Sequence, residues 1–328
     1  MTSAPSPRRI LITGATGFVG RALVSRLAAE GRDVRAAVRK PGDVTLAPGV
    51  EAVDVGEIGA ATDWHAAVSG IDAVVHLAAR VHVTGDDAQT GEGLFRAVNV
   101  DGAVGLARAA RAARVGRFVL ISSTTIYGDR SAGAPFGESS PPAPTTPYAR
   151  SKLEGERAVA AILAGSGTAL IVLRAPLVYG PGAKGNFERL VRLVERGVPL
   201  PLASIRNRRS LLFVGSLVDG IVCALGHPAA AGRTYNVTDV RDISTPELIA
   251  GIAAALGRHP RLLPCPVGVL RAAAALAGRS EELSRLVDDM AVDGWRMRAD
   301  LGWEPPFTFE QGLARSVAGR RGHAGGSG

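Results

Sequence analysis

The sequence predicts an α/β fold, a doubly wound parallel sheet with a smaller C-terminal substrate-binding lobe. Short continuous Val/Ile/Leu runs alternate with helix-like segments through the first half of the chain. Such runs are typical of strands buried on both faces, and these strands form parallel sheets that helices cover. A glycine-rich turn from Gly14 to Gly20 follows the first run directly and opens a helix-like segment. In this architecture, ligands bind at the carboxyl ends of the strands.

The first half of the chain supplies the strands of the predicted sheet. A helix is expected over residues 17–30, because Val19, Leu23 and Leu27 are spaced by four and Gly31 suits a C-terminal cap. The buried strands are expected at residues 9–13, 34–38, 73–77, 118–122 and 170–173.

After about residue 175 the character of the chain changes, because segments rich in Pro and Gly separate short helices expected over 187–196 and 245–256. We predict a dinucleotide-binding Rossmann domain over 8–178, which segments near 209–242 rejoin. Of these, the runs 211–214 and 234–237 are expected to return to the sheet. The remaining predictions are that residues 179–318 form mainly a substrate-binding lobe, that residues 319–328 form a disordered tail and that residues 131–147 form a mobile surface loop.

Charge and composition narrow the class of ligand. The 328 residues carry a formal net charge of +8, but the arginines are scattered and no motif that reads nucleic acid accompanies them. We therefore expect an anionic small molecule and no nucleic acid. Cys223 and Cys265 stand far apart, which argues against a disulfide framework and a zinc site.

No metal site and no membrane insertion are expected. His65, His76 and His82 are not spaced as metal ligands. No stretch approaches the roughly 20 uncharged residues that a membrane helix needs, and residues 1–9 lack the apolar core of a signal peptide. These observations favour a cytoplasmic protein.

The glycine turn predicts a dinucleotide site. Gly14 permits a tight turn, Gly17 lets the backbone approach a pyrophosphate, and Gly20 allows close packing of helix and strand. Amide groups at the start of the helix then face the phosphates.

The end of the second strand bears on the choice of cofactor. An acidic residue there would bind the ribose hydroxyls of NAD, whereas an arginine accommodates the 2′-phosphate of NADP. The strand ends Val38-Arg39-Lys40, which favours NADP, with NAD as the alternative if these side chains are merely solvated. Asp54 is expected either to accept a hydrogen bond from the adenine amino group or to serve a plain turn.

Tyr148 and Lys152 form a Tyr-x-x-x-Lys pair, which a helix starting at Pro147 would place on one face. A nearby ammonium and the oxidised nicotinamide ring would favour the phenolate and lower the pKa of the tyrosine. Tyr148 could then exchange a proton with a carbinol while hydride moves to or from the cofactor. Ser122 and Ser123 end a strand upstream, where a hydroxyl can bond the substrate oxygen.

Together these strings resemble an extended short-chain dehydrogenase/reductase of the NAD-dependent epimerase/dehydratase family, which includes nucleotide-sugar 4-epimerases and 4-ketoreductases. The turn has the spacing GxxGxxG, and the resemblance continues past residue 300 with Leu301-Gly-Trp-Glu-Pro. The other matching strings are Thr13-Gly-Ala-Thr-Gly-Phe-Val-Gly20, Val75-His-Leu-Ala-Ala79, Asn99-Val-Asp-Gly102, Ser122-Ser-Thr-Thr-Ile-Tyr-Gly128, Tyr148-Ala-Arg-Ser-Lys152 and Arg174-Ala-Pro-Leu-Val-Tyr-Gly-Pro-Gly182.

The resemblance implies a catalytic triad of Ser123, Tyr148 and Lys152. It also implies that Ala78 and Ala79 line the nicotinamide side and that Asn99 supports the site. The full set of expected cofactor contacts is Gly14, Thr16, Gly17, Phe18, Val19, Gly20, Arg39, Asp54, Val55, Leu77, Ala78, Ala79, Asn99, Ser122, Tyr148 and Lys152.

The second half resembles the branch that acts on UDP-linked hexoses and N-acetylhexosamines in surface-polysaccharide sugar synthesis. In this branch Arg209 would grip the diphosphate, Lys184 and Asn186 would add contacts, and Ser123 and Thr124 would face the sugar. A solvated basic loop is the alternative for Lys184 and Arg209. The family often dimerises through helices that flank the catalytic tyrosine, so a homodimer is expected.

Three functions remain open from the sequence. The first is hydride chemistry at C4 of a nucleotide sugar, either as a 4-epimerase or as a 4-ketoreductase, and Arg39 tilts this choice slightly towards the NADPH-consuming reductase. The second is a reductase of small carbonyl or sterol-like substrates. The third is a non-catalytic protein that senses NADP, which would be expected to carry a broken triad.

Overall fold

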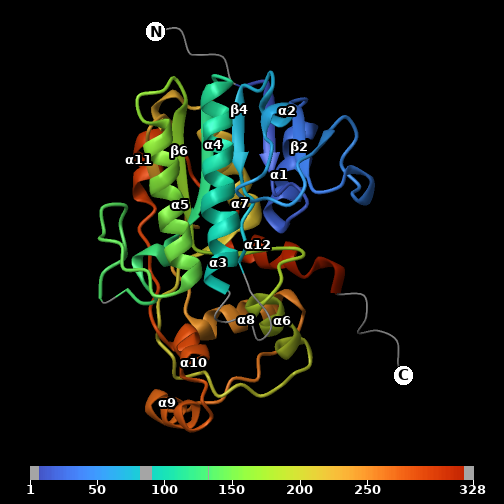
Figure 1. The fold of residues 1–328 in the computed structure, drawn as a ribbon. Helices are drawn as coiled ribbons and strands as arrows, with labels where there is room; N and C mark the ends of the chain where they lie inside the picture. The colour runs from blue at the N-terminus through green and yellow to red at the C-terminus, as the bar shows by residue number, and fades with distance from the viewer. Residues whose placement is uncertain (1–6, 82–90, 132, 321–328) are drawn as a thin grey trace.

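The structure is a computed structural model that describes residues 7–81, 91–131 and 133–320. His82 and the tail residues 321–328 therefore lie outside the described residues. Figure 1 shows a sheet flanked by helices in the upper part of the molecule and a mainly helical lobe below it. No helix in the described part of the chain is long and apolar enough to cross a membrane.

The centre of the molecule is a seven-stranded sheet in the order β3-β2-β1-β4-β5-β6-β9, and every neighbouring pair is parallel. This confirms the predicted doubly wound α/β fold, including all five strands expected in the first half. The strands are β1 (Arg9–Thr13), β2 (Asp33–Val38), β3 (Glu51–Asp54), β4 (Ala73–His76), β5 (Arg117–Ser123), β6 (Ala169–Ala175) and β9 (Thr234–Asn236).

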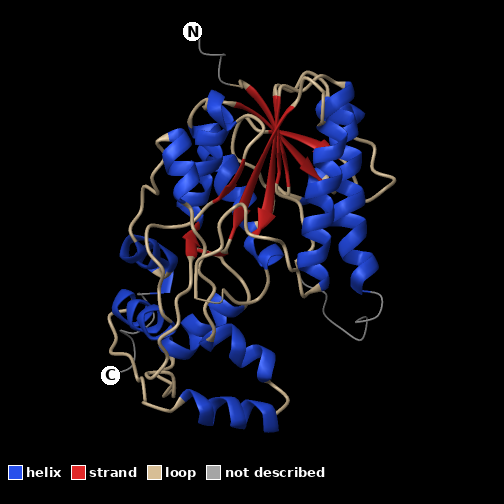
Figure 2. Ribbon diagram, turned by 90° about the vertical axis from the view of Figure 1, so that its left-hand side faces the viewer, coloured by secondary structure: helices blue, strands red, loops and turns tan. Residues whose placement is uncertain are grey.

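Helices cover both faces of this sheet (Figure 2). On one face α1 (Phe18–Ala29) and α7 (Val214–Gly226) bury side chains such as Leu23 and Ile221 against the strands. On the other face α2 (His65–Val68), α4 (Ala103–Ala112) and α5 (Pro147–Leu163) do the same with residues such as Leu106 and Val159. Because both faces are covered, the strands can be apolar throughout.

The lobe has its own apolar core, which includes Phe187, Ile249 and Leu313. Two of its helices were predicted from the sequence, α6 (Asn186–Glu195) and α8 (Thr245–Ala255). Its other helices are α9 (Val267–Leu276), α10 (Ser280–Val287) and α12 (Phe309–Ser316). The short elements elsewhere are α3 (Gly91–Arg96), α11 (Trp295–Leu301), η1 (Pro41–Asp43), η2 (Ala97–Gly102), η3 (Thr124–Tyr127), η4 (Pro228–Ala230) and η5 (Ala318–Arg320).

The division between sheet and lobe differs from the prediction at two places. The run near 234–237 does rejoin the sheet as β9, but β8 (Leu211–Phe213) pairs with β7 (Leu177–Tyr179) in a separate two-stranded sheet. Helix α11, which lies inside the predicted lobe, belongs to the core of the sheet domain through Met297 and Leu301. Strand β8 contributes Leu211 and Phe213 to the apolar core of the lobe, whereas α11 completes the core of the sheet domain.

The two segments predicted to be flexible, residues 131–147 and 319–328, make contacts with the rest of the protein where the structure describes them. The prediction of a disordered tail is wrong for Gly319 and Arg320, which lie in η5, and Arg320 forms ion pairs with Glu188 and Glu195. In the loop 131–147, the Phe136 amide donates to Ala291 O at 2.9 Å.

Candidate active site

The glycine turn between β1 and α1 has the geometry that a bound phosphate requires. Gly14 adopts φ +68°, a conformation that favours glycine. A Cβ atom on Gly20 would lie 2.0 Å from Gly14 O, so a side chain there would force helix and strand apart. Gly17 caps α1 in extended conformation, and its amide donates to Gly14 O at 2.9 Å. The turn therefore presents the amides at the start of α1, among them those of Phe18 and Val19, at the carboxyl edge of the sheet.

Thr13, at the end of β1, holds the carboxyl end of the neighbouring strand β4 in place. Its hydroxyl is hydrogen-bonded to His76 Nδ1 at 2.8 Å and accepts from the Ala78 amide at 3.2 Å. Burial, followed by the charge of Lys152, lowers the pKa of His76 to about 3, so this imidazole is neutral. Leu77 is held alongside, because its amide donates to Thr13 O at 3.3 Å. Leu77 and Ala78 are thus set beside the glycine turn, and the place of residues 77–79 on the nicotinamide side stays a prediction.

The predicted triad comes together at the carboxyl end of β5. Ser123 and Thr124 are buried where the strand passes into η3, and the Ser123 hydroxyl lies 2.9 Å from that of Thr125. Tyr148 lies in the first turn of α5, partly buried, with its ring edge-on to Phe95 at a centroid distance of 6.2 Å. Burial raises the pKa of Tyr148, and a hydrogen bond with Ser123 partly offsets this. The lowering of this pKa by the nicotinamide ring stays a prediction.

Lys152 lies one turn after Tyr148 on α5 and is buried. Its Nζ donates to Ile121 O on β5 at 2.7 Å. Burial lowers the pKa of Lys152 to about 8, and the charge of Glu156 acts in the opposite direction. A buried ammonium beside a tyrosine hydroxyl favours the phenolate.

Asn99 connects the helices around the site. Its side-chain oxygen accepts from the Arg80 amide at 2.8 Å, and its Nδ2 donates to Ser151 Oγ at 2.9 Å and to Arg80 O at 3.1 Å. Asn99 thus ties the segment after β4 to α5, one residue before Lys152. The supporting role in catalysis that the family resemblance implies for Asn99 stays a prediction.

The far end of the predicted cofactor site lies at β2 and β3. Arg39 is exposed and forms an ion pair with Glu57 at 2.9 Å. Asp54 accepts from the Gly56 amide at 2.9 Å, which is the turn role left open by the sequence. Val55 is buried beside β2, with its amide donating to Val38 O at 3.0 Å. Thr16 is exposed in the glycine turn.

The three predicted substrate residues other than Ser123 and Thr124 lie in the second half of the chain. Arg209 is half-buried, with Nη1 donating to Asp288 O at 3.1 Å, and burial lowers its pKa. Lys184 and Asn186 are exposed at the start of α6. Among the described residues, no hydrogen bond or ion pair joins these three side chains to the triad.

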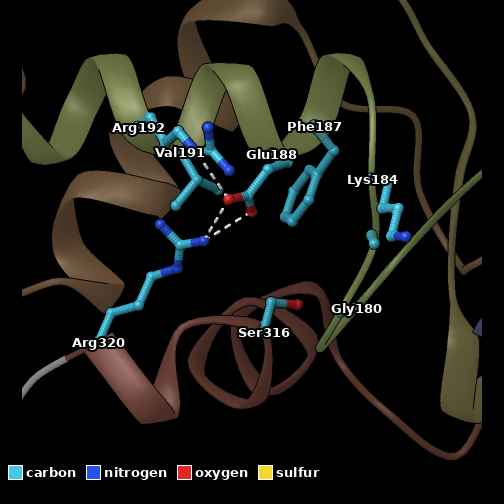
Figure 3. A pocket seen from close by; sticks show the side chains of 10 residues that line it. Gly180, Lys184, Phe187, Glu188, Val191, Arg192, Ser316 and Arg320 are labelled. Atoms are coloured by element: carbon cyan, nitrogen blue, oxygen red, sulfur yellow. Dashed lines mark hydrogen bonds and ion pairs between the residues drawn. The ribbon is translucent and has the colours of Figure 1, made fainter.

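Lys184 also lines a pocket of about 270 Å³ between α6 and α12. Figure 3 shows Phe187 and Glu188 pointing from α6 towards Ser316 and Arg320. Glu188 accepts hydrogen bonds from Arg192 and Arg320 in this pocket, so its carboxylate is already paired with two arginines. The pocket lies beside the predicted substrate contacts and contains none of the triad.

Two residues of the site were missed by sequence reasoning. Thr13 has the strand-end position that drew attention to Ser122, so its place at the end of a buried run could have identified it. Phe95 contacts Tyr148 from α3, fifty-three positions earlier in the chain, and no local pattern predicts that contact.

The residues at the carboxyl edge fit a nicotinamide dinucleotide. The turn has no room for a side chain at Gly20, and a Cβ on Gly14 would lie 2.8 Å from the Ala78 amide nitrogen. The Ser122 hydroxyl is buried at the end of β5 and has no hydrogen-bond partner within the described residues. A glycine cradle and an unsatisfied hydroxyl at one sheet edge suit a ligand with phosphates and further polar groups.

Comparisons with known proteins agree with this geometry. The model of the NAD-dependent epimerase/dehydratase family matches residues 10–238. A UDP-glucose 4-epimerase of Vibrio cholerae is 38% identical over 318 residues, covering 95% of each chain. A 3β-hydroxysteroid dehydrogenase/Δ5→4-isomerase of Mycobacterium tuberculosis is 31% identical over 334 residues, covering 94% of this chain and 89% of the relative. The solved structure of MoeE5 with UDP-glucuronic acid and NAD superposes with a TM-score of 0.76 at 25% identity, covering 94% of this chain and 98% of that one.

Proposed function

We propose that this chain, which belongs to the NAD-dependent epimerase/dehydratase family, is a 4-epimerase of a UDP-linked hexose or N-acetylhexosamine. The observation that carries the proposal is the intact Ser123–Tyr148–Lys152 constellation at the carboxyl end of β5, behind a glycine turn shaped for a dinucleotide. The 38% identical relative that is named a UDP-glucose 4-epimerase supports the reaction and the substrate class.

The cofactor would supply reversible hydride transfer at C4 of the sugar. Gly14, Gly17 and Gly20 would hold its pyrophosphate, and Ala78 and Ser122 lie where they would contact the nicotinamide half. Lys152 holds its position through the bond to Ile121 O. Asn99 keeps α5 at a fixed distance from the segment after β4.

Tyr148 is the group that exchanges a proton with the C4 hydroxyl. Ser123 lowers the pKa of Tyr148 against the effect of burial, and its hydroxyl can also donate to the substrate oxygen as charge develops there. The Lys152 ammonium favours the phenolate that must form when Tyr148 releases its proton. A single tyrosine can serve both halves of an epimerisation, because it takes the proton on oxidation and returns it on reduction.

The lobe residues would bind the nucleotide half of the substrate. Arg209 is a half-buried cation whose pKa burial lowers, so an anionic diphosphate would restore its favourable electrostatics. Lys184 and Asn186 stand exposed at the start of α6, available for further contacts. The polysaccharide context, the cytoplasmic location and the homodimer stay predictions.

A 4-ketoreductase is the second candidate, and Arg39 is the observation that favours it. An arginine at the end of β2 suits NADP, and a reductase consumes the reduced cofactor at each turnover. The steroid dehydrogenase relative keeps the alternative of an apolar ketone, but the half-buried Arg209 favours an anionic substrate. The intact triad argues against a protein that only senses the cofactor.

The decisive experiment follows product stereochemistry and cofactor redox state together. The protein is incubated with UDP-GlcNAc and UDP-glucose in the presence of NAD, and products are identified by NMR of the anomeric proton. An epimerase yields the C4 epimer without net NADH formation. Consumption of NADPH with a UDP-4-keto-6-deoxy sugar, without epimer formation from either sugar, would replace the proposal with the reductase.

Two variants test the assignment of the proton donor. Tyr148→Phe is expected to lower turnover at least about 100-fold while cofactor binding persists, because general acid–base catalysis contributes roughly that much or more. Tyr235→Phe is the matched control, since it removes a buried hydroxyl on β9 that bonds Asp300 at 3.2 Å. Retention of more than a few per cent of turnover by Tyr148→Phe would refute the role of this tyrosine.

A further inference from the structure

Arg174, at the end of β6, makes a dense set of buried hydrogen bonds below the triad. Its Nε lies 3.1 and 3.2 Å from the two carboxylate oxygens of Glu156, and its Nη2 also donates to Glu156. Its Nη1 donates to the Tyr127 hydroxyl at 2.7 Å and to Glu138 O at 3.3 Å. Arg174 and Glu156 are only 8% and 7% exposed, so the pair is shielded from solvent.

The two main partners of Arg174 lie on the two elements that carry the triad. Glu156 is one turn after Lys152 on α5, the helix that also bears Tyr148. Tyr127 ends η3, the short helix that begins directly after Ser123. The guanidinium therefore joins the serine-bearing turn to the tyrosine-bearing helix.

We propose that Arg174 is a positioning residue that fixes the Ser123 turn against the Tyr148–Lys152 helix, and that Glu156 keeps Lys152 in its charged form. The part that concerns turnover rests on the function proposed above. The part that concerns Lys152 does not depend on the substrate.

The shape of the guanidinium explains why an arginine occupies this position. Its planar fork can hold a carboxylate with two parallel bonds and still donate to a third group, which a lysine ammonium cannot do with the same geometry. The far side of Tyr127 is also fixed, since its hydroxyl donates to Asn236 Oδ1 at 2.9 Å and its ring stacks on Phe136 at 5.3 Å. The bond to Arg174 adds a polar connection to α5 beside the apolar packing of Ile126 and Tyr127 against Leu153 of that helix.

The titratable and charged groups around Lys152 lie on three elements. Tyr148 and Glu156 lie on α5, and the neutral His76 lies on β4. Arg174 lies on β6 and acts on Lys152 through its bonds to Glu156. Burial lowers the pKa of Lys152 to about 8, and the Glu156 carboxylate raises it. Removal of that negative charge should therefore make Lys152 lose its proton at lower pH.

The lysine content of the chain permits a direct measurement of this effect. The only lysines are Lys40, Lys152 and Lys184. Competitive labelling with acetic anhydride over a range of pH, read by mass spectrometry, gives the pKa of each amine. In Glu156→Gln, which keeps the shape of the side chain, the pKa of Lys152 is expected to fall by about one pH unit. Lys40 and Lys184 are both exposed and serve as internal controls.

The positioning role is tested by Arg174→Lys and Tyr127→Phe, with Arg117→Lys as the matched control. Arg117 lies at the opposite end of β5, where Nη1 bonds the carbonyls of Ala224 and His227 at 2.9 and 2.8 Å. A misplacement of about 1 Å at a reacting group can cost about 100-fold in rate. We expect kcat of Arg174→Lys to fall about 10- to 100-fold, kcat of Tyr127→Phe to fall less, and KM for the nucleotide sugar to change less than about 3-fold. Arg117→Lys should retain kcat within about 2-fold.

The outcomes separate this proposal from the function it rests on. A wild-type protein without activity on any UDP sugar refutes the proposed function, and the labelling experiment still tests Glu156. An unchanged pKa of Lys152 in folded Glu156→Gln overturns the electrostatic part. An equal fall in kcat for Arg174→Lys and Arg117→Lys, or a loss confined to KM, overturns the positioning part.

Discussion

Arg39 is the residue on which the choice between NADP and NAD depends. Its ion pair with Glu57 joins side chains that are 73% and 83% exposed, so the pair contributes at most about 1 kcal/mol to the stability of the fold. A phosphate group of the cofactor can therefore displace Glu57 from Arg39. Arg39→Ala is expected to weaken NADP binding about 10-fold and to leave NAD binding nearly unchanged, because only NADP carries the 2′-phosphate. Glu57→Gln, which frees the guanidinium, should tighten NADP binding. Titration of both cofactors by protein fluorescence checks this, and tighter binding of NAD with an unaltered ratio in Arg39→Ala would contradict it.

Residues of the site could be predicted where the chemical type of a side chain and its spacing along the chain indicate the same role. Tyr148 and Lys152 could be paired because four residues make one helical turn, and Gly14 because a tight turn needs positive φ. The pairing of Arg174 with Glu156 could not be predicted, since it joins a strand to a helix across eighteen positions. The direction of the pKa shift of Tyr148 also depends on burial, which the motif does not contain.

At the scale of elements, Asp239 lies three residues after β9 and contacts β8 of the small sheet. Its Oδ2 accepts from the Phe213 amide on β8 at 2.9 Å. Burial raises the pKa of Asp239 to about 6, against the lowering effects of Phe213, Ser216 and Tyr179. The folded protein therefore binds this proton more tightly than the unfolded chain, and the free energy of unfolding falls as pH rises from about 4 to 6.

Asp239→Asn removes this dependence. Its stability relative to wild type is expected to improve by about 3 kcal/mol between pH 4 and pH 7, because the carboxylate of the wild type ionises at a cost in that window. Urea denaturation at several pH values measures the difference. If the stability difference between wild type and Asp239→Asn stays constant with pH, the ionisation of Asp239 does not destabilise the folded protein and the prediction is wrong.

Length alone does not explain which elements the sequence predicted, because the three-residue β9 was expected as the run 234–237 and the 13-residue α7 was not. The strands of the first half are apolar runs bounded by turns, and the helices α1, α6 and α8 repeat apolar residues over three turns. Strands β7 and β8 have three residues each, too few to establish a period, so β7 was not predicted and the run 211–214 was assigned to the wrong sheet. Their pairing with each other depends on the position of the lobe, which no local signal specifies.

At the scale of the whole molecule, Arg320 ties the end of the described chain to α6. It donates to Glu188 and Glu195, and its side chain is 29% exposed. Arg320→Ala is expected to speed hydrogen exchange in α6 several-fold while β1 and β4 stay protected, because about 1 kcal/mol of local stability is lost. Arg315→Ala is the matched control, since that arginine packs over the Phe307 ring at 4.5 Å and not on α6. Equal exchange of α6 in the two variants would contradict this role of Arg320.

The division into two bodies was predicted from the change in composition near residue 175, but its detail was not. The chain returns to the sheet domain with α7 and β9 and again with α11, after passing through the lobe. The return with α7 and β9 falls within the segments near 209–242 that the sequence predicted to rejoin the sheet domain, whereas the return with α11 was not predicted.

These returns mean that the molecule cannot be divided with a single cut. A fragment ending at residue 178 would keep the glycine turn and the triad, yet it would lose Leu217 and Ile221 of α7, which pack against the strands beside α1. It would also leave β6 as an open edge, ready to pair with another chain. Truncation at residue 178 is therefore expected to give an aggregating protein and not a minimal cofactor-binding unit. Separate sheet and lobe proteins would require circular permutation of the chain.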